Sequence, residues 1–80
     1  MKVKIKYFAS MREKCGKSDE VLDTNSENPK ELFDEITKKY SLNININTLK
    51  VAINESYESF ETKLEEMDVV AFIPPVAGGW

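Results

Sequence analysis

One segment of this 80-residue chain has the pattern of a long amphipathic helix, and it limits what the rest can form. Asn28 is placed to cap the helix, Pro29 suits its first position, and Glu31 is placed for the return bond of a capping box. The pattern predicts a helix over residues 29–40. Its apolar stripe consists of Leu32, Phe33, Ile36 and Tyr40. In a domain of this size one helix covers only one face of a sheet, so the other face is left open.

Strand patterns surround this helix. Residues 2–8 alternate between lysines and apolar side chains, which is the two-residue period of a strand. The remaining predicted elements are a helical turn over 10–15 that Gly16 ends, strands over 19–24, 50–54, 57–60 and 69–73, a loop over 41–50 whose isoleucines touch the helix, and a turn over 61–67. The order β-α-β-α-β-β-β predicts an α+β fold, with a mixed sheet and one main helix on one face.

Apolar side chains break the polar pattern of an open sheet face. Phe8 falls on the lysine side of the first strand, VVAFI at 69–73 is apolar on both sides, and Tyr57 lies in the predicted hairpin. Apolar groups on an uncovered face are typical of a partner surface. The alternative is that Phe8 wraps a sheet edge or that loop 41–50 covers it. On the first interpretation, we expect Phe8 and Ile73 to be exposed in the free protein and buried in a complex.

Composition lowers the weight of several functional classes. The chain lacks histidine, the usual general base and commonest metal ligand, and its single cysteine, Cys15, permits neither an internal disulfide nor a zinc cluster. No apolar run approaches the length of a membrane span, and the first residues contain no signal-peptide core. The net charge of −3 argues against nucleic acid. We therefore expect a cytoplasmic protein with no metal and no membrane or nucleic-acid partner.

The charge is unevenly distributed along the chain. Residues 1–17 hold six of the 11 Lys and Arg residues but only one of the 14 acids. Such a basic end is either a solvated face or a surface that steers an acidic partner into place.

The last seven residues, PPVAGGW, differ from the rest of the chain. Pro74 and Pro75 cannot extend a strand ladder. Gly78 and Gly79 have no side chains, so this backbone can enter a narrow channel and approach a reactive group closely. The alternative is a frayed terminus. We expect a folded domain over residues 1–75 and a flexible tail over residues 76–80.

Three stretches of the sequence resemble a known family. The pattern FxPPVAGG stands before the last residue, KVKIKYFASMRE opens the chain, and VAIN lies at 51–54. In the opening stretch Phe8, Ala9, Arg12 and Glu13 stand in the family's places. On these stretches the chain resembles the MoaD/ThiS family of ubiquitin-like sulfur carriers, which implies a β-grasp fold.

The resemblance implies a sulfur carrier that is not an enzyme on its own and needs no cofactor. In the members that serve molybdopterin synthase, an ATP-dependent activating enzyme adenylates the C-terminal carboxyl group, here that of Gly79, which then becomes a thiocarboxylate. The sulfur is donated to cyclic pyranopterin monophosphate within a heterotetramer with the synthase large subunit, in molybdenum cofactor biosynthesis. Two alternatives stay open: a related carrier for thiamine, cysteine or another thio-metabolite, and a ubiquitin-like modifier joined to lysines.

The same resemblance implies roles for individual residues. Gly79, preceded by Gly78, carries the sulfur. The residues expected to bind partners are Phe8, Arg12, Tyr57, Phe72, Ile73, Pro74, Pro75, Val76 and Ala77.

Two residues depart from the family's pattern. Met67 stands where the family usually has glycine, so a left-handed backbone there would be strained. Trp80 follows the diglycine, and we expect a processing protease to remove it. Cys15, by contrast, is interpreted as a small buried hydrophobe and not as a reactive thiol.

Overall fold

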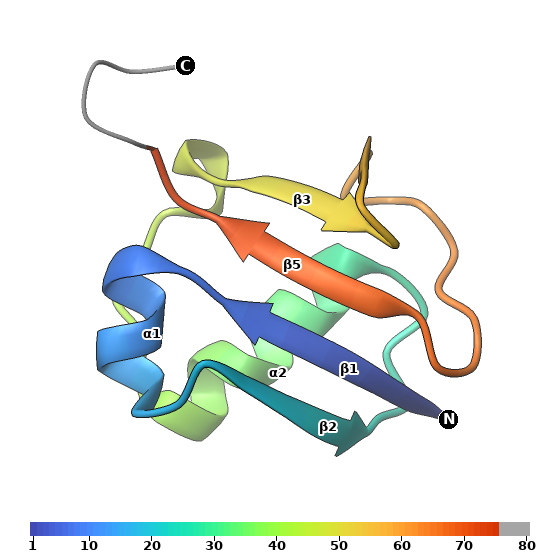
Figure 1. Cartoon of the computed structure of the whole chain (residues 1–80), viewed down its shortest axis with the longest axis horizontal. Coiled ribbons are helices and arrows are strands. Elements are labelled where there is room, and N and C mark those ends of the chain that lie inside the picture. The colour runs from blue at the N-terminus through green and yellow to red at the C-terminus, as the bar shows by residue number, and fades with distance from the viewer. Residues whose placement is uncertain (76–80) are drawn as a thin grey trace.

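The computed structural model describes residues 1–75 and confirms the predicted order of elements (Figure 1). In chain order the elements are β1 (Lys2–Tyr7), α1 (Ala9–Cys15), β2 (Asp19–Asp23), α2 (Pro29–Tyr40), the 3-10 helix η1 (Ile46–Thr48), β3 (Lys50–Ile53), β4 (Ser56–Glu58) and β5 (Val69–Ile73). The strands form one sheet in the order β2-β1-β5-β3-β4. β1 and β5 run parallel, and every other neighbouring pair is antiparallel. The described part of the chain is therefore an α+β domain with a mixed sheet.

The main helix, α2, lies across one face of the sheet, behind the strands in Figure 1. The predicted cap is confirmed, because the side chain of Asn28 accepts a hydrogen bond from the backbone N–H of Glu31 at 2.9 Å. The return bond differs by one residue from a capping box. The Glu31 carboxylate accepts from the N–H of Glu27, at 2.9 Å, and not from that of Asn28.

The core fills the space between the sheet and α2. It consists of the apolar side chains that alternate along β1, every second side chain of β5, and the predicted apolar stripe of α2. Its buried side chains include Val3, Ile5, Tyr7, Leu32, Phe33, Ile36, Val70 and Phe72. The ring of Phe72 packs against those of Phe33 and Phe60, with centroid distances of 5.6 and 6.3 Å.

Phe72 therefore belongs to the core and not to the open face. Its side chain is completely buried, since it alternates with Ala71 and Ile73 along β5. Its register partners, Tyr7 and Val51, are buried on the same side. The expectation that Phe72 contributes to an exposed partner surface is wrong, because VVAFI is apolar on both faces and the sequence does not say which residues the helix covers.

In loop 41–50, Ile44 and Ile46 pack against the core, to which α2 contributes, and a 3-10 turn lies at the end of the loop. The structure does not support the alternative that this loop covers Phe8. The hollows that include Phe8 are lined, among the described residues, by other parts of the chain.

Several turns use left-handed backbone. Asn54 and Glu55, with φ of 52° and 71°, form the two-residue turn between β3 and β4. Gly16 ends α1 at φ 75°, as predicted. Met67 has φ 66°, so the position where glycine was expected is indeed left-handed. A non-glycine residue there costs about 1–2 kcal/mol.

Candidate functional site

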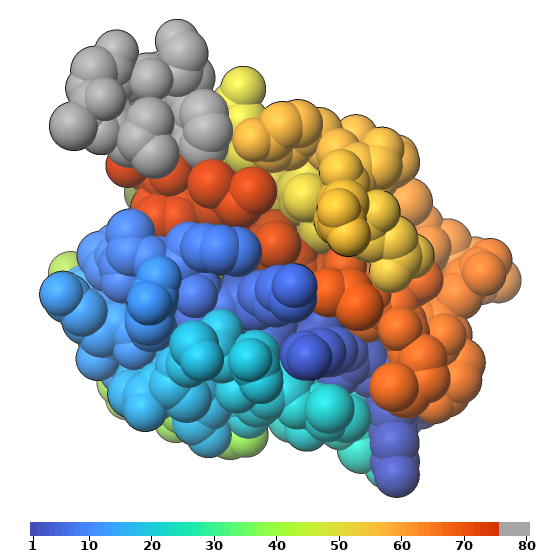
Figure 2. Space-filling view, in the orientation of Figure 1, coloured from blue at the N-terminus to red at the C-terminus, as the bar shows by residue number. Residues whose placement is uncertain are grey.

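The face of the sheet opposite α2 is the side turned to the viewer in Figures 1 and 2. The register places Lys6 of β1 beside Ala71 of β5, and Ala71 beside Ala52 of β3. Tyr57 of β4 follows next to Ala52. Two alanines at the middle of the face leave room between the larger side chains around them, so a shallow hollow forms there.

This sheet-face hollow is mostly apolar. Its lining residues are Lys6, Phe8, Ala52, Glu55, Tyr57, Val69, Ala71 and Ile73. The side chain of Phe8 is 39% exposed and that of Tyr57 is 64% exposed. The structure thus brings together, on one face, three of the residues expected to bind partners: Phe8, Tyr57 and Ile73.

A second hollow lies beside the first, where β5 leaves the sheet. We call it the tail-root hollow, and its lining residues are Phe8, Ala9, Arg12, Ile73 and Pro74. Phe8 and Ile73 line both hollows, so the two form one continuous apolar surface. Pro75, the last described residue, is exposed at its edge. Arg12 and Pro74 therefore lie at this surface, and Pro75 follows directly after it in the chain.

The orientation of Phe8 depends on an unusual helix start. Phe8 is extended, with φ −124° and ψ 151°, and caps α1. The next residue, Ala9, has φ 49°, which a residue with a Cβ seldom adopts. The carbonyl of Phe8 accepts a hydrogen bond from the N–H of Met11 at 3.1 Å, and the buried Met11 side chain anchors the turn. Local strain of this kind is common at functional surfaces.

Basic side chains border the apolar surface. Lys6 lines the sheet-face hollow, and Arg12 lines the tail-root hollow. Within residues 1–75 neither takes part in an ion pair, since the three ion pairs there involve the N-terminus, Lys17 and Lys39. The ammonium group of Lys50 lies 5.8 Å from the centre of the Tyr57 ring. Glu55 also lines the sheet-face hollow, so the border carries two cations and one anion. An apolar surface with such a border suits a partner that presents apolar groups and a small excess of acidic ones.

A carboxylate on the α2 side of the sheet supports the strand that leads to Phe8. Glu20 of β2 accepts hydrogen bonds from the hydroxyls of Tyr7 and Tyr40, each at 2.6 Å, and from the ammonium of Lys39 at 3.0 Å. Partial burial opposes ionisation of Glu20, but these hydrogen bonds from Tyr40, Tyr7 and Lys39 outweigh it and lower the pKa of Glu20 to about 2.

No local sequence pattern points to Glu20 as a member of this cluster. The available signal was the two tyrosines at core positions, Tyr7 and Tyr40, since a buried phenol needs a hydrogen-bond partner. Burial and the bond to Glu20 raise the pKa of Tyr7 well above its usual value, so this hydroxyl stays protonated and donates.

Cys15 is buried at the end of α1, as predicted. Burial raises the pKa of its thiol, which disfavours the nucleophilic thiolate. The side chain therefore packs as a small hydrophobe.

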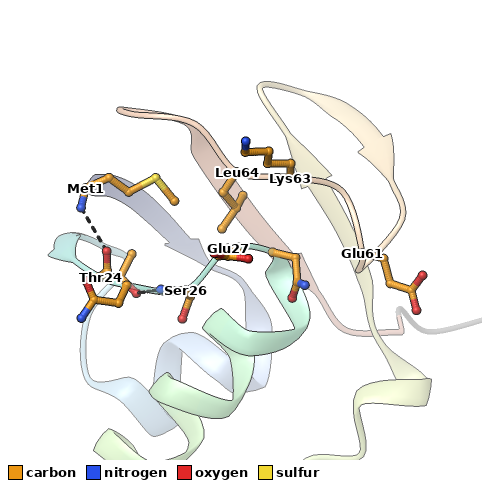
Figure 3. A pocket seen from close by; sticks show the side chains of 9 residues that line it. Met1, Thr24, Ser26, Glu27, Glu61, Lys63 and Leu64 are labelled. Atoms are coloured by element: carbon orange, nitrogen blue, oxygen red, sulfur yellow. Dashed lines mark hydrogen bonds between the residues drawn. The ribbon is translucent and has the colours of Figure 1, made fainter.

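A polar hollow lies near Met1, at the end of the sheet away from Pro74 (Figures 1 and 3). There the N-terminal ammonium group donates to the carbonyl of Thr24 at 3.1 Å. The hydroxyls of Thr24 and Ser26 both donate to the carboxylate of Glu35. These groups satisfy one another and join the loop before α2 to the helix, which indicates a structural role.

Within residues 1–75, no group of three or more Cys, Asp or Glu side chains is arranged to hold a metal ion. None of the helices in that range is long and apolar enough to cross a membrane. The remaining predicted site residues, Val76, Ala77, Gly78, Gly79 and Trp80, lie outside the described part of the chain.

Comparison with known sequences gives a family and full-length relatives. The sequence profile of the ThiS family matches residues 5–79. The chain is 35% identical over 82 residues to the molybdopterin synthase sulfur carrier subunit of Mycobacterium tuberculosis, with 99% of each chain covered. It is 38% identical over 85 residues to the protein of the same name from Anopheles gambiae, covering 99% of this chain and 93% of that one.

Comparison with solved structures gives the same fold. A putative molybdopterin converting factor subunit 1 from Pyrococcus furiosus is 29% identical with a TM-score of 0.78, over 95% of this chain and 99% of that one. Small archaeal modifier protein 1 from Methanosarcina acetivorans is 27% identical with a TM-score of 0.78, over 98% and 96%. A complex of subunits 1 and 2 of molybdopterin-converting factor from Helicobacter pylori contains a chain that is 25% identical with a TM-score of 0.70, over 99% and 100%. The predicted ubiquitin-like β-grasp fold is confirmed.

Proposed function

Since the chain belongs to the ThiS family, we propose that it is the sulfur carrier subunit of a molybdopterin synthase. The observation that supports this most is the similarity to two sulfur carrier subunits over almost the whole chain, at 35% and 38% identity. The open apolar face around Phe8 and the tail that begins beside it give that role a physical basis.

The first part of the proposal is docking. The related Helicobacter pylori chain is known in a complex of subunits 1 and 2. By analogy, this chain would bind a large subunit, and the assembly would be a heterotetramer. The contact surface would consist of Phe8, Arg12, Tyr57 and Ile73, continued by Pro74, Pro75, Val76 and Ala77. Phe8 is the best candidate for a dominant contact, since it is aromatic and lines both hollows.

The second part is the chemistry at the chain end. A free carboxylate is a poor electrophile, so the Gly79 carboxylate would first attack ATP in the activating enzyme and form an acyl-adenylate, with pyrophosphate as leaving group. A persulfide sulfur would then displace AMP, and reduction of the sulfur–sulfur bond by a thiol would leave a terminal thiocarboxylate. The tail would carry that sulfur to cyclic pyranopterin monophosphate in the large subunit, and the carrier itself would supply no acid, base or metal. We place these steps in the cytoplasm.

The third part is removal of Trp80, because only the last residue of a chain has a free carboxyl group. With Trp80 present the terminal carboxyl is displaced by about 3.5 Å, and a misplacement near 1 Å can already lower a rate about 100-fold. A processing protease would therefore expose Gly79 before activation.

Mass spectrometry of the intact protein tests this function. The full-length chain and a chain that ends at Gly79 are each incubated with activating enzyme, ATP and a sulfur donor. We expect the shorter form to gain the mass difference between sulfur and oxygen and the longer form to stay unchanged. Equal conversion of both forms would refute the processing step. Conversion of neither, with an activating enzyme that modifies its own known carrier, would refute the sulfur-carrier function.

A second candidate function is a ubiquitin-like protein modifier joined to lysines through Gly79. The specific observation in its favour is the similarity to small archaeal modifier protein 1, at 27% identity and a TM-score of 0.78. Isopeptide-linked forms in cell extract would favour it. A third candidate, a carrier for thiamine, cysteine or another thio-metabolite, would be favoured by a biosynthetic enzyme and a metalloprotease encoded beside it.

A further inference from the structure

We propose that Asn54 is a positioning residue, which holds the β3–β4 hairpin, and with it Tyr57, as a fixed wall of the sheet-face hollow. It does so through the hydrogen bonds that join Asn54 to Asp68 and Val69, which we call the hairpin clamp. The clamp belongs to the free protein, whereas its effect on docking rests on the proposed function.

By itself the β3–β4 hairpin is weakly held. β4 is three residues long, lies at the edge of the sheet and, within residues 1–75, pairs with β3 alone, and its three side chains are exposed. The turn residues Asn54 and Glu55 both have left-handed backbone. Asparagine tolerates that conformation, but glutamate does not favour it, and glycine is the usual second residue of such a turn. Strained backbone of this kind persists only where the surrounding structure fixes it.

Asn54 supplies the contacts that fix the turn. Its backbone N–H donates to the carbonyl of Val69 at 2.8 Å, and its side-chain carbonyl accepts from the N–H of Val69 at 3.0 Å. Its side-chain NH2 group donates to the carboxylate of Asp68 at 2.9 Å. The orientation of the amide is unambiguous, because an ionised carboxylate only accepts and a backbone N–H only donates. One residue thus joins the turn to the start of β5, at the same end of the sheet (Figure 1).

Asp68 is itself fixed to the rest of the domain. Its second carboxylate oxygen accepts from the N–H of Glu65 at 2.8 Å, and its backbone carbonyl accepts from the N–H of Lys4 at 2.9 Å. Lys4 belongs to β1, an interior strand whose side chains Val3 and Ile5 are completely buried. The clamp therefore connects an edge hairpin to a firmly packed part of the fold.

The clamp lies at the border of the sheet-face hollow. Two of the lining residues, Glu55 and Tyr57, belong to the hairpin, and a third, Val69, is hydrogen-bonded to Asn54. The Tyr57 side chain is 64% exposed, so its position follows that of the backbone that carries it. After β4 the chain reaches Phe60, which packs against the core. The hairpin is thus anchored on both sides, and the clamp is the anchor on the side of the hollow.

A wall that is already in place favours docking, because the partner does not have to order it. If a variant holds the hairpin in its docking position in only a fraction of the molecules, the apparent dissociation constant rises by the inverse of that fraction. A fraction of about one fifth corresponds to a fivefold rise, or about 1 kcal/mol. That fraction can be measured in the free protein, so the expected loss of affinity is known before any partner is added.

Two substitutions break the clamp and leave the turn backbone favourable. Asn54→Gly deletes the side chain, and glycine accepts left-handed backbone readily. Asn54→Asp keeps the size of the side chain and the tolerance of that backbone, but it replaces the donor to Asp68 with a carboxylate oxygen. The matched control is Asn45→Gly, which removes a side chain that accepts from the N–H of Asn47 at 2.9 Å and does not line the hollow. Circular dichroism checks that each variant is folded.

The first measurement is made on the free full-length chain and needs no partner. NMR relaxation dispersion detects exchange of residues 55–58 between the clamped and a displaced position and gives the population of each. We expect one position in the unaltered chain and in Asn45→Gly. In both Asn54 variants we expect a displaced position that holds most of the molecules.

The second measurement is calorimetric titration of the processed chain with the large subunit. We expect Asn54→Gly to weaken binding by the inverse of the measured fraction, about fivefold, and Asn45→Gly to leave it unchanged. In the Tyr57→Ala background the further effect of Asn54→Gly should fall below about twofold, because the side chain that the clamp positions is gone. A purely structural role would lower stability in both backgrounds and leave the affinity per folded molecule unchanged.

Three outcomes would overturn the proposal. These are a hairpin that stays in one position in both Asn54 variants, a displaced hairpin that binds as tightly as the clamped one, and a loss of affinity that is the same with and without Tyr57. A large subunit that binds no form of the chain would overturn the docking role together with the proposed function. The NMR comparison would then still decide whether Asn54 holds the hairpin.

Discussion

The two faces of the sheet are made by the same strands but differ in what covers them. In β1, Val3 and Ile5 point to α2 and are completely buried, whereas Lys4 and Lys6 alternate with them on the open face. In β5 the side chains on both faces are apolar, so Phe72 fills the core while its neighbour Ile73, on the open face, stays partly exposed. Apolar side chains on the helix side hold the domain together, and those on the open side remain available for contact.

The largest effect should come from the buried face. Phe72→Ala removes a ring that packs against Phe33 and Phe60, so we expect the free energy of unfolding to fall by about 3–5 kcal/mol. In a small domain such a loss leaves little stability. Urea denaturation followed by circular dichroism measures it. A loss below about 1 kcal/mol would mean that the core can collapse around the gap and that the two faces differ less than their burial indicates.

On the open face, Phe8→Ala should weaken binding to the partner much more than it lowers the stability of the domain. The ring is partly exposed, so we expect a small change in unfolding free energy but a loss of roughly 2 kcal/mol or more in binding to the large subunit. Calorimetric titration of the processed chain measures this, with Val21→Ala as the control. If Phe8→Ala unfolds the domain and binding per folded molecule is unchanged, Phe8 is a core residue and the contrast between the faces fails there.

The pH dependence of the free energy of unfolding should show how much the ionised Glu20 side chain stabilises the fold. Its pKa of about 2 in the folded protein lies below its unfolded value of about 4.3, so the ionised form favours the fold. That contribution is complete above the unfolded pKa and is lost as the pH falls towards 2. We expect Glu20→Gln to cost about 2 kcal/mol at neutral pH.

Urea denaturation over a series of pH values measures this difference. It should shrink as the pH falls from about 5 to about 2. Glu13→Gln, at an exposed position of α1, is the control. A difference that is independent of pH would show that the two tyrosine hydroxyls bind the glutamine as well as the carboxylate.

The smallest expected effect is a gain in stability when Met67 is replaced by glycine. This residue is 53% exposed and has φ 66°, so its side chain contributes little packing while its backbone is strained. We expect Met67→Gly to raise the free energy of unfolding by up to about 1 kcal/mol, reduced by the greater freedom of glycine in the unfolded chain. Thermal unfolding measures this, and Met67→Ala, which keeps the strain, is the control. A loss of stability in Met67→Gly would show that the side chain makes contacts that outweigh the strain.

Local sequence patterns predicted most of the fold correctly. The cap at Asn28, the alternation in residues 2–8 and the end of α1 at Gly16 depend on neighbours within a few residues, so they can be recognised without the tertiary structure. The exposed position of Phe8 followed from the same reasoning, because it breaks the alternation of its own strand.

The residues whose positions differ from the local patterns are those that depend on long-range contacts. Phe72, which the resemblance groups with the partner-binding residues, is fully buried, and no local pattern indicates Glu20, which joins β2 to Tyr7 and Tyr40. The role of each depends on residues distant in sequence, namely Phe33 and Phe60 for Phe72 and the end of α2 for Glu20. No periodicity within one segment contains that information.

By itself, the sequence determined which segments are strands and helices, that one sheet face would be left open, and that the chain ends in a diglycine followed by Trp80. The tertiary structure decided which half of VVAFI is covered and that Phe8 and Ile73 adjoin both Tyr57 and Arg12 around two connected hollows. The physical reason is the range of the forces involved. Backbone conformation responds to neighbours along the chain, whereas burial of a side chain depends on which strand and helix happen to lie against it.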